Sequence, residues 1–142
     1  MQKLFFEIQI EADPEKVWDV LWSDITYRQW TTAFTEGSFY MGTFEEGSII
    51  KFFDPNNNGM YSRIEKNIPH KEMKFLHLGE IYNGVESEQD WGEATEGYIL
   101  EETGSGTTLK IEIQTPEEFK GFFEEKFPIA LGIVKNLSEN QL

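Results

Sequence analysis

Hydrophobic and polar residues alternate at the start of the chain, with the period of two that is typical of a β-strand. Within residues 4–10, one face carries only large apolar side chains: Leu4, Phe6, Ile8 and Ile10. Asp13 and Pro14 follow and predict the start of a helix, because Asp is a favourable N-cap and Pro suits the first helical position. The apolar residues expected on this helix are Val17, Trp18, Leu21 and Trp22. A second short helix is expected at residues 25–30.

The middle of the chain reads as strands separated by turns. Asn, Gly and Pro residues mark these turns, most clearly in residues 54–59. Six strands are expected, at residues 38–42, 48–53, 59–67, 72–82, 95–102 and 107–115. In the strand at 72–82, period-two alternation predicts one inward face, made of Met73, Phe75, His77 and Ile81. Residues 83–93 are acidic, contain Trp91, and are expected to form a long exposed loop.

The last apolar residues recur at steps of three and four, which is the helical period. They fall within residues 117–138: Phe119, Phe122, Phe123, Phe127, Ala130, Ile133, Val134 and Leu137. Pro128 lies inside this segment and predicts a kink near Glu124, because it removes one backbone hydrogen bond and clashes with the preceding turn. The predicted fold class is therefore α+β. A seven-stranded antiparallel curved sheet wraps around a long C-terminal helix, and two short helices follow the first strand.

Composition narrows the classes of function. The chain has 142 residues, enough for one core, so we expect a single domain over residues 1–142. The net charge is −14, from 26 acidic and 12 basic residues, which disfavours binding to nucleic acid or to anionic membranes. No apolar run reaches the roughly 20 residues of a membrane span, and the N-terminus lacks the apolar block of a signal peptide. We therefore expect a cytoplasmic protein. The absence of cysteine excludes disulfides and thiolate metal sites.

The order of the expected elements resembles that of the START-like, helix-grip superfamily, also called SRPBCC or birch-allergen-like. Residues 8–30 resemble the opening of the group related to the activator of the Hsp-90 ATPase, with Val17, Trp18 and Trp30 at the characteristic places. Residues 59–80 resemble the middle hairpin of that group. These motifs are structural, so the resemblance implies the fold more directly than any activity. Nothing in the sequence matches the separate chaperone-binding part of the true activators.

Candidate chemistry is sparse. His77 is the only histidine expected on an inward face, either as a hydrogen-bonded core residue or as a polar anchor for a ligand. His70 is expected in a turn, and its odd spacing from His77 argues against a shared metal. No nucleophile elbow, phosphate loop or dinucleotide motif occurs. The sequence thus predicts no catalytic residue, no metal and no cofactor.

The leading hypothesis is a non-enzymatic protein that binds a small hydrophobic or amphipathic molecule between the sheet and the last helix. The predicted wall consists of Trp30, Phe52, Met73, Phe75, His77, Tyr98, Ile111, Phe119 and Phe123, with His77 and Tyr98 as polar anchors. Whether the Phe stripe of the last helix fills a core or roofs a cavity stays open. The resemblance also implies an enzyme of the cyclase, aromatase or hydrolase kind as an alternative. A protein-interaction or chaperone-related module that presents residues 83–93, and a homodimer, are further alternatives.

Overall fold

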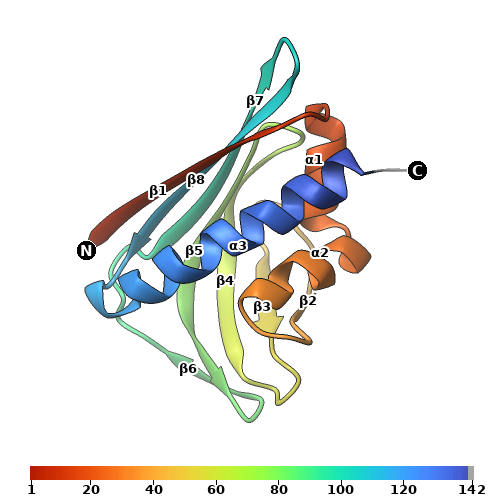
Figure 1. Ribbon diagram of the computed structural model, residues 1–142. Coiled ribbons are helices and arrows are strands. Elements are labelled where there is room, and N and C mark those ends of the chain that lie inside the picture. Colours follow the sequence, from red (N-terminus) through yellow and green to blue (C-terminus); the bar gives the residue numbers. More distant parts are fainter. Residues whose placement is uncertain (141–142) are drawn as a thin grey trace.

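The alternating segments form one antiparallel sheet, which curves around a long C-terminal helix in the computed structural model (Figure 1). The structure describes residues 1–140. The strands are β1 (Gln2–Ile10), β2 (Phe39–Met41), β3 (Ile49–Phe53), β4 (Gly59–Ile68), β5 (Glu72–Tyr82), β6 (Val85–Glu88), β7 (Thr95–Thr103) and β8 (Gly106–Thr115). The helices are α1 (Pro14–Trp22), α2 (Asp24–Trp30) and α3 (Lys120–Glu139). The predicted α+β class and element order are confirmed.

The strand order is β1-β8-β7-β5-β4-β3-β2, and β6 pairs with β5 beside this path. The first half of β5 pairs with β7, from Glu72↔Ile99 to Leu76↔Thr95, and its last residues pair with β6. The expectation that residues 83–93 form only an exposed loop is therefore wrong, because Val85–Glu88 is an eighth strand. A hairpin needs only backbone hydrogen bonds to extend the sheet, and these leave no mark in the hydrophobic pattern.

A β-bulge interrupts the pairing of β4 with β5. Ser62 pairs with His77 and Tyr61 pairs with Gly79, so Leu78 is an extra residue in β5. Such an insertion reverses the alternation of side chains beyond it. The expectation that Ile81 shares the inward face of His77 is consequently wrong, and Glu80 faces inward in its place.

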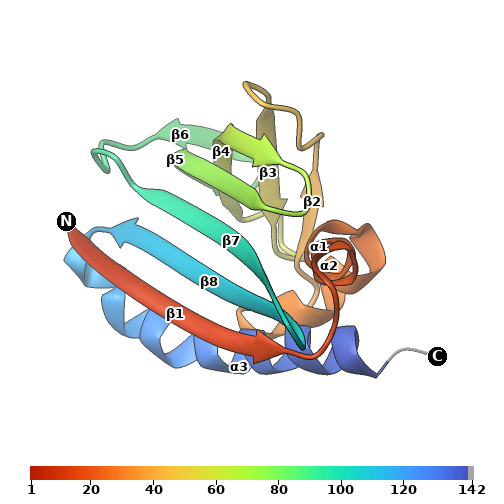
Figure 2. The same cartoon turned by 90° about the horizontal axis from the view of Figure 1, so that it is seen from above.

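The helices begin where local chemistry favours them. Asp13 caps α1 through a hydrogen bond from the Lys16 backbone N–H to its Oδ1 (2.9 Å), and Pro14 occupies the first helical position. A 3₁₀ turn at Glu117–Phe119 precedes α3, which continues through Pro128. Seen from above, α3 crosses one face of the sheet, and α1 and α2 close one end of it (Figure 2). None of the helices in residues 1–140 is long and apolar enough to cross a membrane.

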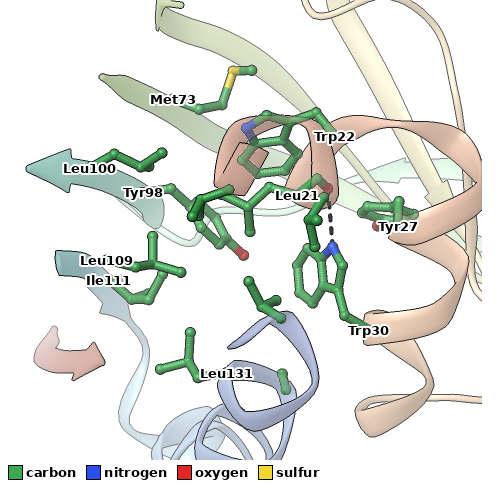
Figure 3. Close-up of a cluster of buried hydrophobic side chains, with 14 of the residues drawn as sticks. Leu21, Trp22, Tyr27, Trp30, Met73, Tyr98, Leu100, Leu109, Ile111 and Leu131 are labelled. Atoms are coloured by element: carbon green, nitrogen blue, oxygen red, sulfur yellow. Dashed lines mark hydrogen bonds between the residues drawn. The ribbon is translucent and has the colours of Figure 1, made fainter. Parts of the chain in front are cut away.

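The core lies between the sheet, α1 and the C-terminal half of α3. Its fully buried members include Val17 and Leu21 of α1, Leu109 and Ile111 of β8, and Val134 of α3. Figure 3 shows this cluster, with Tyr98 reaching from β7 toward Leu21 and α3. The Trp30 indole N–H donates to the Leu21 carbonyl oxygen at 3.0 Å, which joins α2 to α1.

Candidate functional site

A cavity of about 480 Å³ lies beside this core, between the strands, α2 and the N-terminal part of α3. Aromatic side chains form most of its wall. They come from the helical segment after β1, from the strands, from the segment before β7 and from the start of α3: Trp22, Tyr27, Trp30, Phe34, Phe52, Phe53, Phe75, Trp91, Tyr98, Phe119, Phe122, Phe123 and Phe127. Ligand pockets typically have volumes of roughly 300–1,000 Å³ and mostly apolar walls. The cavity therefore has the dimensions and lining of a site for a small organic molecule.

The structure brings seven of the nine predicted site residues to this cavity: Trp30, Phe52, Phe75, His77, Tyr98, Phe119 and Phe123. The other two, Met73 and Ile111, are 1% and 0% exposed and belong to the adjoining core. Phe127 of α3 is only 1% exposed, and it also contributes to the lining.

Three polar residues of the wall, His77, Glu96 and Tyr98, form a connected network with the buried Ser62 behind them. The His77 ring lies between Ser62 and Glu96, with Nδ1 at 2.7 Å from the Ser62 hydroxyl and Nε2 at 3.2 Å from Glu96 Oε1. The Tyr98 hydroxyl donates to the second oxygen of the same carboxylate. Glu96 and Tyr98 are two residues apart on β7, so strand geometry places both side chains on the same face, which is the cavity face.

The hydrogen bonds of this network form a consistent set. The Ser62 side chain is fully buried, and its hydroxyl forms a hydrogen bond only with His77 among the described residues. If the Ser62 hydroxyl donates to Nδ1, Nε2–H donates to Glu96, and the Glu96 carboxylate accepts from both His77 and Tyr98. Glu96 is the acidic group of the network.

Two buried tyrosines border this carboxylate. Burial, reinforced by the charge and the hydrogen bond of Glu96, raises the pKa of Tyr98 well above its usual value. Burial and, second, the charge of Glu96 also raise the pKa of Tyr27. Both phenols therefore stay neutral at physiological pH, so neither adds charge to the cavity.

Ser62, His77 and Glu96 are the residue types of a nucleophilic triad, but their geometry does not support nucleophilic catalysis. A catalytic serine must present its oxygen to a substrate. Ser62 is 0% exposed and lies behind His77, outside the cavity lining. Within residues 1–140, no group of three His, Asp or Glu side chains is arranged to hold a metal ion.

Sequence reasoning missed three acidic residues of the lining: Asp54, Glu80 and Glu96. Glu96 could have been found, because it has the same parity as Tyr98 in a predicted strand. Glu80 could not, since the bulge at Leu78 brings it to the cavity face. Trp91, expected on an exposed loop, instead packs edge-on against Phe119, with 6.3 Å between ring centroids, and both rings line the cavity.

The chain matches solved structures. No protein-family profile and no curated protein matches it. The solution structure of the Aha1 dimer from Colwellia psychrerythraea superposes with a TM-score of 0.78 at 24% identity, covering 99% of this chain and 98% of that one. Protein MLL2253 from Mesorhizobium loti gives a TM-score of 0.76 at 15% identity, covering 96% of both chains. The chain therefore shares the fold of these structures, an antiparallel sheet curved around a long C-terminal helix.

A third structure extends this likeness to part of a longer chain. DynU16, a protein of the dynemicin biosynthetic locus, gives a TM-score of 0.74 at 12% identity, covering 96% of this chain but 46% of that one. At these identities the likeness is one of fold, and the function has to be argued from the cavity itself.

Proposed function

We propose that this protein binds a small apolar or amphipathic molecule in the aromatic cavity. The observation that carries the proposal is the cavity of about 480 Å³, which has aromatic walls and an internal polar network. Burial of a ligand's apolar surface would supply the affinity, at about 25 cal/mol per Å². His77, Glu96 and Tyr98 would fix the orientation of its polar group.

The chemistry of the cavity supports this proposal over an enzymatic function. The cavity lies between the strands, α2 and the start of α3. The cavity contains a carboxylate that is already hydrogen-bonded to two partners, and it exposes no serine next to the histidine. These features suit a residue that orients a ligand better than one that attacks it. We accordingly place His77 and Tyr98 in positioning roles.

The direct test is native mass spectrometry of the purified protein, which should retain a small molecule. Titration with the neutral fluorophore N-phenyl-1-naphthylamine provides an independent measurement. Phe123→Ala should change the affinity for this probe several-fold, because the Phe123 ring lines the cavity. Phe5→Ala is the matched control, since Phe5 is 68% exposed on the opposite face of β1. Absence of both a retained molecule and probe binding would refute the proposal.

We further propose that residues 1–142 act as one domain and that two copies associate. The support for association is that the Colwellia protein with the same fold is described as a dimer. Light scattering coupled to size exclusion would measure the mass in solution. A mass near that of one 16.6 kDa chain at micromolar concentration would contradict the dimer without affecting the cavity.

A further inference from the structure

The charges of the cavity wall all have one sign. Three carboxylates line it, from Asp54, Glu80 and Glu96, and the lining contains no lysine or arginine. His77 is the only basic residue of the lining, and both of its ring nitrogens are already hydrogen-bonded, to Ser62 and to Glu96. The potential inside the cavity is therefore negative, and the net charge of −14 on the whole chain reinforces it.

The three carboxylates differ in how free they are to bind a ligand. Asp54 Oδ1 accepts the backbone N–H groups of Asn56 and Asn58, at 2.8 and 3.0 Å, and so stabilises the turn before β4. Glu80 is exposed and forms no salt bridge within residues 1–140. Glu96 is the interior carboxylate, with a side chain only 18% exposed. Each Glu96 oxygen accepts one hydrogen bond, although a carboxylate oxygen can accept two, so a ligand donor can still bind there.

The Tyr27 hydroxyl is a second, independent group of the cavity that can accept a hydrogen bond from a ligand. Tyr27 lines the cavity, is 7% exposed, and its hydroxyl has no hydrogen-bond partner in the described part of the chain. Tyr27 and Glu96 belong to the lining of the same cavity. A phenol oxygen can accept a hydrogen bond from a ligand whose other hydrogens reach Glu96. Trp22, Trp30 and Phe75 also belong to this lining, and aromatic rings attract cations.

We infer that the ligand is a cation, namely a protonated amine with an aromatic or hydrocarbon body, and that its ammonium group binds Glu96 and the Tyr27 hydroxyl inside the aromatic cavity. This inference rests on the proposed function and adds the charge of the ligand to it. The apolar body occupies the space between α2 and the Phe residues at the start of α3. Glu80 at the exposed edge attracts the same charge and repels fatty acids, phosphates and other anions.

The test compares three probes of equal shape that differ in charge: 2-(naphthalen-2-yl)ethylamine, 2-(naphthalen-2-yl)ethanol and 2-naphthaleneacetate. Isothermal titration at neutral pH should give the amine an affinity about tenfold or more above that of the alcohol, because a charge-assisted hydrogen bond is the stronger one. The acetate should bind weakest. Raising the salt concentration should weaken amine binding and leave alcohol binding nearly unchanged.

Variants then locate the charge. Glu96→Gln should reduce amine affinity by about tenfold and alcohol affinity by less than about threefold. Glu112→Gln removes one negative charge from the exposed face of β8, and as the matched control it should change neither. Glu80→Gln should lower the association rate for the amine with a smaller change in affinity. Circular dichroism melts of each variant verify that it is folded.

The outcomes separate the two proposals. An alcohol or acetate that binds as tightly as the amine would overturn the inference and leave the cavity as a binding site. Equal losses from Glu96→Gln and Glu112→Gln would also overturn it, because a general charge effect would then explain amine binding. If none of the three probes and no neutral fluorophore binds, both the inference and the proposed function fail.

Discussion

The two halves of α3 contain the same helical apolar pattern but face different surroundings. In the C-terminal half, Ala130, Leu131 and Val134 are at most 5% exposed, as is Phe127 just before it. In the N-terminal half, Phe122 is 44% exposed, and Phe123 lines the cavity together with Phe119 of the preceding 3₁₀ turn. Small residues such as Ala130 let the helix approach its neighbours closely, whereas the Phe rings at the start of the helix border the cavity. The period of a helix thus shows which face turns inward, but the sizes of the side chains decide whether the space is filled.

Polar contacts also attach the C-terminal half of α3 to the end of β1. Lys135 Nζ donates to the Gln9 carbonyl oxygen at 2.7 Å, and the Glu11 N–H donates to Glu139 Oε2 at 2.7 Å. These bonds join the end of α3 to the end of β1. No comparable bond between the start of α3 and the sheet is present within residues 1–140.

Removing α3 altogether should have the largest effect. A chain that ends at residue 116 exposes the inner face of the sheet, and the burial lost exceeds the roughly 5–15 kcal/mol by which a domain is stable. We expect an insoluble or molten product, detected by a non-cooperative thermal melt and by size exclusion. A truncated chain that unfolded cooperatively as a monomer would show that the sheet does not depend on α3.

Truncating one packed ring and one cavity ring of α3 should separate the two kinds of surroundings. Phe127→Ala should lower the free energy of unfolding by about 3–5 kcal/mol, because the ring is buried against Phe6, Phe34 and Tyr98. Phe123→Ala should cost roughly 1–2 kcal/mol, since its ring faces space that is already empty. Urea denaturation measures both. Equal, large losses would mean that Phe123 is packed as tightly as Phe127.

The polar network of the cavity should have an intermediate effect. His77→Phe leaves the buried Ser62 hydroxyl and one Glu96 oxygen without their partners, and should destabilise the protein by about 1–3 kcal/mol. Ser62→Ala removes the hydroxyl itself, so adding it to His77→Phe should recover part of that loss. Chemical denaturation of the two single variants and the double variant gives the coupling. If the losses of stability in the two single variants simply added up in the double variant, the His77–Ser62 hydrogen bond would be contradicted.

The smallest effect is expected for Glu139 at the C-terminal end of α3, and it depends on pH. The N–H of Glu11 and, second, the Lys135 ammonium hold the pKa of the Glu139 carboxyl below its usual range. A carboxyl whose pKa is lower in the folded state stabilises the protein above its unfolded pKa, and this contribution is lost as pH falls through the folded pKa. Glu139→Gln should therefore lower stability slightly at neutral pH and not at strongly acidic pH. Thermal melts across this range would contradict the assignment if the difference stayed constant.

Sequence reasoning captured whatever depends on periodicity. It located seven strands, three helices and six of the thirteen aromatic residues of the wall, because each follows from alternation by two or by three and four. It missed β6, whose residues Val85–Glu88 are all exposed and carry no apolar pattern. It misplaced Ile81 and Glu80, because a bulge is a backbone event that shifts parity without changing composition. Asp54 and Trp91 reach the cavity from turns and loops, whose paths periodicity does not predict.

The pairing of β1 with β8 has a consequence for how the chain folds. Gln2 pairs with Thr115 and Ile10 with Thr107, so β1 pairs with a strand that is synthesised only after all the strands between them. Closing so long a stretch of chain costs entropy before any contact forms, which slows folding. Until β8 emerges from the ribosome, the apolar face of β1 has no sheet to join and is open to association with other chains. The abundant negative charge of the chain keeps such nascent copies apart.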